Sequence, residues 1–351
     1  MSKQSPSSIS NVRVTEFDLL RTPRELASAH PLNDEVRQVV ADGRRALREC
    51  LAGTDRRLVV IVGPCSIHDP RSALEYATRL AGLREQVADK MMLVMRVYFE
   101  KPRTTVGWKG LITDPDHNGS DDMNRGLEEA RKILLAINGL GLPCATEFLD
   151  PIVPQYVADL VSWAAIGART TESQTHRQMA SGLSMPVGFK NSTDGGLEVA
   201  VQAMEAASAP HAFLGINVEG QTSVVRTTGN PDTHVVRRGG GGKSNYSRAD
   251  IAYTRALLGE ADAGPRAIMV DCSHANSGKD YRKQPVVFGN VIEQVLAGEE
   301  ALLGMMLESH LVEGRQALGE SMTYGQSVTD ACIGWETTEE LLLGAHERLS
   351  A

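Results

Sequence analysis

Several features that mark other classes of protein are missing from this sequence of 351 residues. No apolar run approaches the roughly 20 residues that a membrane-spanning helix needs, so we expect no membrane segment. Residues 1–11 are polar and serine-rich and lack the apolar core of a secretory signal. The cysteines number five, an odd count without paired spacing, which is typical of a reducing compartment. These absences together predict a cytoplasmic protein.

An excess of positive charge is also missing. The net charge of −8 argues against nucleic acid as a partner and provides no overall field that would attract anionic substrates. Any anion site must therefore be a local cluster of cations that works against the charge of the whole chain. With 42% hydrophobic and 23% charged residues, the composition is that of an ordinary globular protein able to bury a large core.

Short apolar strands alternate with amphipathic helices along the chain. The β-branched run 58–62 predicts a strand buried on both faces, followed by Asp69 as N-cap and Pro70 as first helical residue. The other predicted strands are 91–99, 143–148, 162–167, 186–190, 234–238, 266–271 and 302–308. The predicted helices are 70–87, 123–138, one starting at Asp150-Pro151, 173–183, 194–207, 247–260, 285–297 and one from Trp335. Capping boxes are expected at Ser247/Asp250 and at Thr337/Glu340, so the last helix could also be counted from Thr338.

Eight strand–helix units favour a closed (β/α)₈ barrel, the TIM barrel, with a β-hairpin at 211–226 inserted before the sixth strand. A doubly wound open sheet is the alternative, but it would carry a glycine fingerprint where this chain has Gly-Pro-Cys-Ser. Residues 1–47 fall outside the count, and helices are predicted there at 22–26 and from 33 to 50. We therefore expect an N-terminal helical extension, 1–47, that contacts the barrel or a partner, and a catalytic barrel, 48–351.

The stretch 96–105 carries the strongest functional signal. A buried apolar strand changes abruptly into three cations, Arg96, Lys101 and Arg103, with Pro102 stiffening the bend between two of them. A strand that ends in this way typically binds phosphate or carboxylate, because the planar fork of arginine suits such anions. The alternative is a solvated strand end whose charges lie in water. Three cations within eight positions favour the anion site.

Residues with chemical uses follow most of the predicted strands. In a barrel the carboxyl ends of the strands form the catalytic face, so we expect these side chains to meet at one mouth. They are Cys65, Arg96, Lys101, Arg169, Lys190, Arg238, His274, Glu308 and Asp330. This convergence predicts an enzyme.

Four of these residues, Cys65, His274, Glu308 and Asp330, are of types that bind metals. Their mixed thiolate, imidazole and carboxylate donors suit Mn²⁺, Fe²⁺, Co²⁺ or Zn²⁺ better than Mg²⁺ or Ca²⁺. Taken singly, three of them have a plainer interpretation: Cys65 as a core cysteine, His274 as a hydrogen-bonded structural histidine and Glu308 as an ion-paired glutamate. Cys65 could also be a nucleophile, but no histidine stands where it would clearly act as its base.

The remaining five cations would repel one another around one pocket unless a polyanion lay among them. Arg103 and Thr104 stand a little apart and indicate a second, smaller phosphate site. Two anionic substrates and a divalent metal predict metal-assisted carbon–carbon chemistry on phosphorylated compounds.

Long motifs in this chain resemble those of the metal-dependent, type I class of 3-deoxy-D-arabino-heptulosonate 7-phosphate (DAHP) synthases. They include Gly-Pro-Cys-Ser-Ile-His-Asp from 63, Arg-Val-Tyr-Phe-Glu-Lys-Pro-Arg-Thr-Thr from 96, Gly-Ala-Arg-Thr-Thr-Glu-Ser-Gln from 167, Asp-Cys-Ser-His-Ala-Asn-Ser from 271 and Tyr-Gly-Gln-Ser-Val-Thr-Asp-Ala-Cys from 324. The resemblance implies a TIM barrel that condenses phosphoenolpyruvate with erythrose 4-phosphate and water and releases phosphate. This reaction opens the shikimate route to aromatic amino acids, and the family implies a homodimer or homotetramer.

The resemblance also implies roles for individual residues. Phosphoenolpyruvate would be bound by Arg96, Lys101, Gly167, Ala168, Arg169, Lys190 and Arg238. Erythrose 4-phosphate would be bound by Pro102, Arg103, Thr104 and Asp330. One divalent metal on Cys65, His274, Glu308 and Asp330 would polarise the aldehyde, which makes Cys65 and His274 catalytic, and Lys101 would protonate the developing alkoxide.

Family members usually carry an inhibitor cavity for an aromatic amino acid away from the mouth. The matching positions are Pro154, Gln155, Met179, Leu183, Ser184, Phe213, Gly215 and Val225. Tyrosine-sensitive relatives tend to have glycine where this chain has Gly215, so tyrosine is the expected inhibitor; a packed hairpin without ligand is the alternative. For the whole protein two alternatives stay open: another metal-dependent sugar-phosphate aldolase or lyase, and a catalytically idle sensor of an aromatic amino acid.

Overall fold

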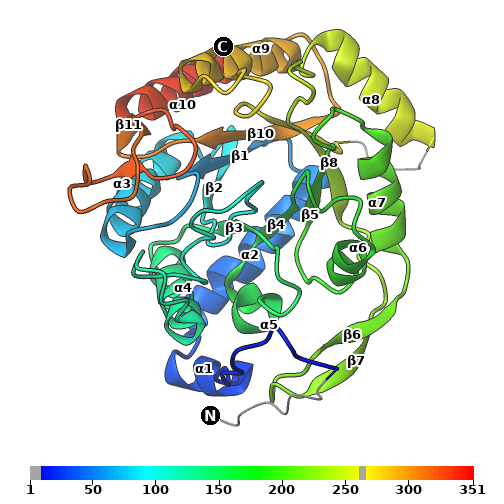
Figure 1. Cartoon of the computed structure of the whole chain (residues 1–351). Coiled ribbons are helices and arrows are strands. Elements are labelled where there is room, and N and C mark those ends of the chain that lie inside the picture. Colours follow the sequence, from blue (N-terminus) through cyan, green and yellow to red (C-terminus); the bar gives the residue numbers. More distant parts are fainter. Residues whose placement is uncertain (1–8, 261–265) are drawn as a thin grey trace.

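Eight parallel strands close into a barrel in this computed structural model, which describes residues 9–260 and 266–351 (Figure 1). Around the barrel the order is β1–β2–β3–β4–β5–β8–β9–β10, so each strand lies beside its neighbour in the chain. Their bounds are β1 (Leu58–Gly63), β2 (Met91–Arg96), β3 (Cys144–Glu147), β4 (Trp163–Ile166), β5 (Val187–Lys190), β8 (Thr233–Arg237), β9 (Ile268–Asp271) and β10 (Leu302–Glu308). The predicted (β/α)₈ barrel is confirmed, and the open sheet is excluded.

Helices form the outer ring of the barrel (Figure 1). They are α3 (Pro70–Val87), α4 (Met123–Gly139), α5 (Pro154–Val157) with η1 (Ala158–Leu160), α6 (Gln174–Ala180), α7 (Glu198–Ser208), α8 (Arg248–Glu260), η2 (Tyr281–Lys283) with α9 (Gln284–Leu296), and α10 (Trp335–Ser350). Asp69 caps α3 as expected, because its carboxylate accepts hydrogen bonds from the N–H groups of Arg71 and Ser72. Ser247 and Asp250 form the predicted capping box at α8.

Two helix starts were predicted wrongly, whereas the predicted start at Trp335 is confirmed and only its capping box is absent. No helix begins at Asp150-Pro151, because Pro154 has no N–H to donate to the carbonyl of Asp150, and only the single turn α5 follows. The helix expected from 194 begins at Glu198, after Gly195 takes a φ of +106°. At α10 the capping box does not form: Gly334 is the N-cap and makes no side-chain cap, and the helix starts at Trp335. Strand β2 ends at Arg96 rather than at 99.

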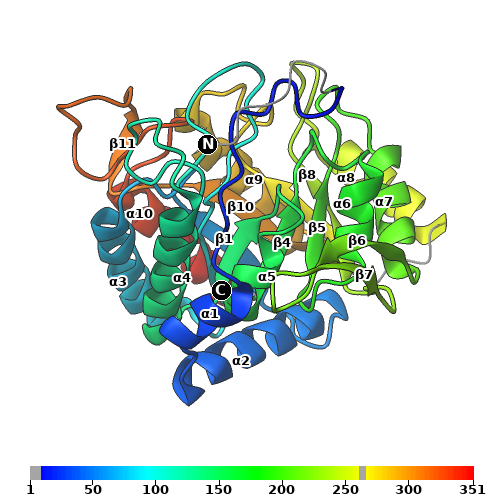
Figure 2. The same ribbon diagram turned by 60° about the horizontal axis from the view of Figure 1, so that its bottom comes forward.

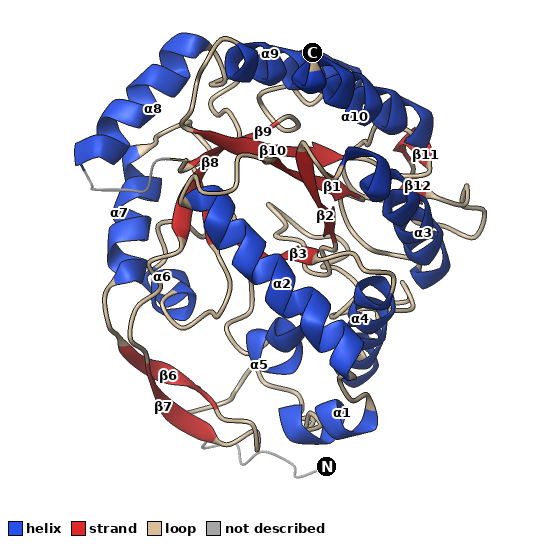
Figure 3. Cartoon of the chain, turned by 180° about the vertical axis from the view of Figure 1, so that it is seen from behind, coloured by secondary structure: helices blue, strands red, loops and turns tan. Residues whose placement is uncertain are grey.

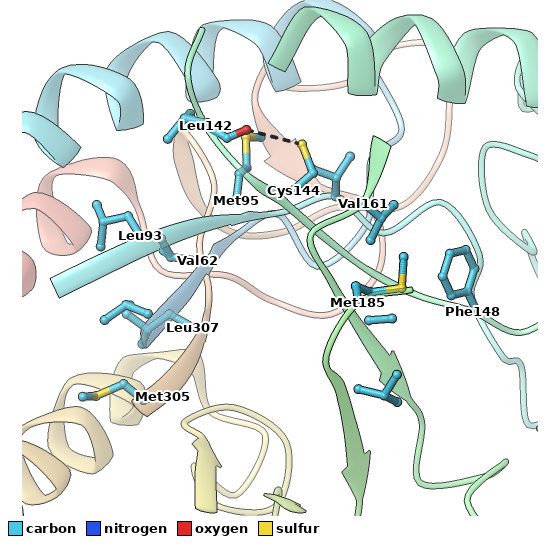
Figure 4. Packing of buried hydrophobic residues seen from close by; sticks show 14 of the residues in the cluster. Val62, Leu93, Met95, Leu142, Cys144, Phe148, Val161, Met185, Met305 and Leu307 are labelled. Carbon is cyan, nitrogen blue, oxygen red and sulfur yellow. Dashed lines mark hydrogen bonds between the residues drawn. The ribbon is translucent and has the colours of Figure 1, made fainter. Parts of the chain in front are cut away.

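The buried apolar residues form two layers on either side of the strands. Along β1, Leu58, Val60 and Val62 face the outer helices, whereas Val59 and Ile61 face the barrel interior, as the twofold period of a strand requires. Figure 4 shows part of the outer layer, including Val62 and Leu307 from neighbouring strands. Because each strand packs against an apolar layer on both faces, its sequence is a continuous hydrophobic run.

One end of the barrel is closed by α2 (Asp34–Leu51), which crosses it in Figure 3. The buried residues of α2 recur at helical spacing, and Leu47 and Cys50 join the interior layer. At Gly43 an added Cβ would lie 2.8 Å from the hydroxyl of Ser162, so the helix packs closely on the barrel. The opposite, carboxyl end of the strands is therefore the end available to ligands.

Two small sheets lie outside the barrel (Figure 2). The predicted hairpin is present as β6 (Ala212–Ile216) and β7 (Thr222–Arg226). A second pair, β11 (Val312–Arg315) with β12 (Gln326–Ser327), was not predicted. The tip of the hairpin touches α1 (Pro23–Ala29), where the N–H of Arg24 donates to the carbonyl of Val218. Within the described residues no helix combines the length and apolar character needed to cross a membrane.

Candidate active site at the barrel mouth

A cleft of about 300 Å³ opens at the carboxyl ends of the barrel strands. Its walls contain every residue predicted to bind either substrate, although these residues come from five strand ends and their loops. They are Arg96, Lys101, Pro102, Arg103, Thr104, Gly167, Ala168, Arg169, Lys190, Arg238 and Asp330. His274 lines the same cleft. The structure thus brings together in one place the cations that the sequence places apart.

Arg96 is held rigidly at the base of the cleft. Its guanidinium donates to the carbonyls of Pro64 and Cys65 and to the carboxylate of Glu308, 3.0 Å away, and it stacks 3.5 Å from the centre of the Tyr98 ring. Only 1% of the Arg96 side chain is exposed. A buried guanidinium needs such partners, because removing its charge from water without them would cost several kcal/mol. Arg96 therefore connects the anion cleft with Glu308.

Lys190 lies between two buried carboxylates that the sequence analysis missed. Its ammonium is 3.6 Å from Glu147 and 3.4 Å from Asp271. Burial acts to raise the pKa of Glu147, but the charges of Lys190 and Lys101 outweigh it, so the pKa is lowered and Glu147 is ionised. Both acids end barrel strands, so the strand-end argument that singled out Lys190 could have found them too.

The loops after β2 and β4 meet over the outer part of the cleft. Arg169 donates to the carbonyl of Pro102 at 3.4 Å and to the hydroxyl of Thr104 at 3.3 Å. Arg103, Thr104 and Arg169 are all exposed. This side of the mouth thus differs from the side of Arg96 and Lys190, because its cations are exposed to water rather than buried.

Three of the four predicted metal ligands form a compact group. One ligand atom each from Cys65, Glu308 and Asp330 lies within 4.8 Å of the others. His274 stands outside this group, although it lines the same cleft as Asp330. Sulfur and carboxylate donors at this spacing fit a divalent transition metal and do not single out one ion.

The Cys65 thiol is kept protonated by its surroundings when no metal is bound. Burial, with a smaller contribution from the charge of Glu308, raises the pKa of Cys65 to about 11. The ammonium of Lys101 lies 3.1 Å from the sulfur and works in the opposite direction. A metal must therefore displace a proton from Cys65 when it binds.

Three of the eight predicted inhibitor positions line one cavity apart from the cleft at the mouth. A cavity of about 680 Å³ between α1, α5 and the hairpin tip is lined by Pro154, Gln155 and Ser184. Met179 and Leu183, which precede Ser184 in the chain, are buried in the core and do not line this cavity. The hairpin residues Phe213, Gly215 and Val225 share one face of the hairpin: a Cβ on Gly215 would lie 2.9 Å from a Val225 methyl and 3.8 Å from the Phe213 ring.

The sequence and the fold both have close counterparts among known proteins. The profile of the DAHP synthetase I family matches residues 33–343. The Tyr-sensitive phospho-2-dehydro-3-deoxyheptonate aldolase of Escherichia coli is 54% identical over 97% of this chain and 96% of its own. The Phe-sensitive aldolase of the same species is also 54% identical, over 95% of each chain. The solved phospho-2-dehydro-3-deoxyheptonate aldolase of Francisella tularensis superposes with a TM-score of 0.94 at 44% identity and covers 96% of this chain and 98% of its own.

Proposed function

The chain belongs to the DAHP synthetase I family, and we propose that its barrel mouth condenses phosphoenolpyruvate with erythrose 4-phosphate and water to give DAHP and phosphate. This is the first step of the shikimate pathway. The observation that carries the proposal is the cleft itself, in which cations sufficient for two phosphorylated substrates lie beside a Cys65, Glu308 and Asp330 group. A chain with a net charge of −8 would not gather these cations without an anionic ligand to bind.

Phosphoenolpyruvate is assigned to the inner part of the cleft. Arg96 and Lys190 are fixed there by their buried partners, so they offer charge in a preset position and lose little entropy when the substrate binds. Lys101, Arg169, Arg238 and the backbone of Gly167 and Ala168 complete this part of the wall. Glu147 is an ionised group that lines this part of the cleft, and it can accept a proton from the water that adds to the enol carbon.

Erythrose 4-phosphate is assigned to the outer part, where Pro102, Arg103 and Thr104 approach Arg169. The exposed Arg103 can turn toward the phosphate, and the Thr104 hydroxyl can donate to it. The aldehyde end of the sugar would then point inward toward Asp330. Two separate anion sites explain why this mouth carries more cations than an aldolase with a single phosphorylated substrate requires.

The metal would be held by Cys65, Glu308 and Asp330, with His274 as fourth ligand. When bound, a Mn²⁺, Fe²⁺, Co²⁺ or Zn²⁺ ion supplies Lewis-acid polarisation of the aldehyde oxygen. Lys101 lies beside Cys65 and can protonate the alkoxide that forms when the new carbon–carbon bond closes. Burial acts to lower the pKa of Lys101, but nearby anionic groups outweigh it and the pKa is raised, so Lys101 carries the required proton.

A phosphate-release assay tests the proposal directly. We expect phosphate only when both substrates are present, loss of the reaction with a chelator, and recovery with several divalent transition metals. Another sugar-phosphate aldolase would release no phosphate under these conditions. An idle sensor would bind an aromatic amino acid without turnover, and such a protein would be expected to have lost a ligand or a cation, whereas all are present here.

We further infer feedback inhibition by tyrosine at the hairpin side. The relatives include a Tyr-sensitive and a Phe-sensitive aldolase of equal identity, so overall similarity does not choose between the two amino acids. Gly215 favours tyrosine, because a larger residue would crowd Val225 and leave less room for a phenol group. Gln155 and Ser184 can meet polar groups of the inhibitor.

A second copy of this chain is the proposed partner, as a homodimer or homotetramer in the cytoplasm. The arm before α1 carries exposed apolar side chains, including Phe17 and Leu19, and the outer face of the hairpin exposes Leu214 and Val224. Such apolar surface is typical of an interface. We assign residues 1–47 to contacts between subunits and to regulation. Sedimentation analysis of the full chain tests this assignment.

A further inference from the structure

Asp271 occupies the end of β9, three residues before His274, and is completely buried. One carboxylate oxygen, Oδ1, accepts hydrogen bonds from the Ser273 N–H at 3.0 Å and from the Ser273 hydroxyl at 2.7 Å. The other oxygen, Oδ2, makes no hydrogen bond of good geometry within the described residues, although it is buried. It nevertheless lies 2.9 Å from Nδ1 of His274 and 3.4 Å from the ammonium of Lys190.

These contacts fix which ring nitrogen of His274 carries the proton. The Ser273 hydroxyl gives its proton to Asp271, so it can only accept at its contact of 2.7 Å with Nδ1 of His274. The neighbouring Oδ2 belongs to a carboxylate that accepts twice from Ser273 and lies beside the ammonium of Lys190, so it is also an acceptor. Nδ1 is therefore the N–H nitrogen, and the lone pair of Nε2 is left available to a metal.

We propose that Asp271 is a positioning residue that couples the metal half of the site to the phosphoenolpyruvate half. Its Oδ2 is shared between His274, a predicted metal ligand, and Lys190, a predicted substrate cation. When the substrate engages Lys190, more of the Asp271 charge acts on His274 and makes its free nitrogen a better ligand. By reciprocity, metal on His274 leaves Lys190 freer for the substrate. This inference rests on the proposed function.

The coupling is measured as metal affinity with and without phosphoenolpyruvate. Co²⁺ is the probe, because its absorption reports a bound thiolate and needs no turnover. In the wild type, phosphoenolpyruvate should tighten Co²⁺ binding. In Asp271→Asn, Co²⁺ alone should bind about 10- to 100-fold more weakly, as is usual when the partner of a ligating histidine is removed. The tightening by phosphoenolpyruvate should also shrink severalfold.

Two further variants separate positioning from general damage. Asp89→Asn is the matched control, because Asp89 also pairs with a histidine, His346, at 2.7 Å, but on the exposed surface; it should leave Co²⁺ binding unchanged. Ser273→Ala removes the hydroxyl that contacts both His274 and Oδ1 of Asp271, and it leaves the carboxylate of Asp271 in place. It should weaken Co²⁺ binding but keep the tightening by phosphoenolpyruvate, because the Lys190–Asp271 contact remains.

Failure of the coupling can be distinguished from failure of the proposed metal site. If the wild type does not bind Co²⁺ through Cys65, the proposed metal site is wrong. If it does, and folded Asp271→Asn keeps the wild-type tightening by phosphoenolpyruvate, the coupling is refuted. Should Asp271→Asn fail to fold, nitrogen NMR of the metal-free wild type decides instead, with His274→Ala used for assignment. A proton on Nδ1 is expected, and a proton on Nε2 would overturn the inference.

Discussion

The mouth of the barrel and the outer face of the hairpin differ in how far their side chains are buried and paired within this chain. At the mouth, Arg96, Lys190 and Glu308 have side chains that are at most 4% exposed, and each has an oppositely charged partner within the same chain. On the hairpin, Leu214 is 78% exposed and Val224 is 59% exposed. Charge compensation at the mouth is therefore complete within one chain, whereas the hairpin exposes the apolar surface that we propose a second copy covers.

The difference follows from the free-energy cost of burying charge at the mouth and of exposing apolar surface on the hairpin. Charges buried without partners would destabilise the fold by several kcal/mol each, so a charged cleft can exist only if its counter-charges fold with it. Exposed apolar side chains are tolerated in a single chain and become favourable when covered. Substitutions at the mouth should thus abolish function in every assembly state, and substitutions on the hairpin should act through assembly and inhibition.

The largest effect is expected at the mouth. Cys65→Ser should lower the rate about a thousandfold, which corresponds to about 4 kcal/mol of lost stabilisation of the transition state, and should leave the protein folded. Phosphate release at saturating metal measures it. Cys50→Ser makes the same change at the closed end of the barrel and should retain activity. Wild-type activity of Cys65→Ser in the presence of a chelator would contradict the metal assignment.

A large effect on assembly is expected at the hairpin. Leu214→Glu combined with Val224→Glu places charge where we expect a covered apolar surface. Losing two buried aliphatic contacts at about 1.5–3 kcal/mol each should weaken association by about 100-fold or more. Sedimentation velocity should show smaller species, with catalysis of single turnovers largely preserved. Leu296→Glu, at another exposed apolar position, is the control and should not change the assembly.

The two regions should also respond differently to pH. Because the metal-free Cys65 has a pKa of about 11, its thiol is protonated at neutral pH and must release a proton when it binds metal. Apparent metal affinity should therefore rise about tenfold for each unit of increasing pH between pH 7 and 9. Metal titrations at constant ionic strength measure this slope. The assembly state should not change over the same range, and a pH-independent metal affinity would show that Cys65 is not a ligand.

The smallest effect is expected for inhibitor choice. Gly215→Ser should weaken inhibition by tyrosine and favour phenylalanine by a factor of about ten, or about 1.4 kcal/mol, because the new side chain takes room beside Val225. Initial rates with each amino acid measure it. The rate without inhibitor should stay near that of the wild type, because Gly215 is not part of the cleft at the mouth. Stronger inhibition of the unmodified chain by phenylalanine would refute the interpretation of Gly215.

Much of the fold could be predicted from the sequence, because local rules determined it. The run of β1, the Asp69 cap and the spacing of α2 each depend on residues close together in the chain. The cations of the mouth were also predicted, because each ends or follows a strand, and strand ends of a parallel barrel share one face. The start predicted at Asp150 failed when a proline further along removed one N–H.

Tertiary structure decided which residues became partners. The sequence placed Lys190 at the mouth, but only the closed barrel brought Glu147 and Asp271 to either side of it. Likewise, Cys65 and Asp330 lie 265 positions apart and come within 3.7 Å of each other. Strand periodicity determines the face of the barrel on which a side chain emerges, and its position along the strand determines the end. The distances between side chains from different strands depend instead on how the barrel closes. Those distances determine charge compensation and metal binding.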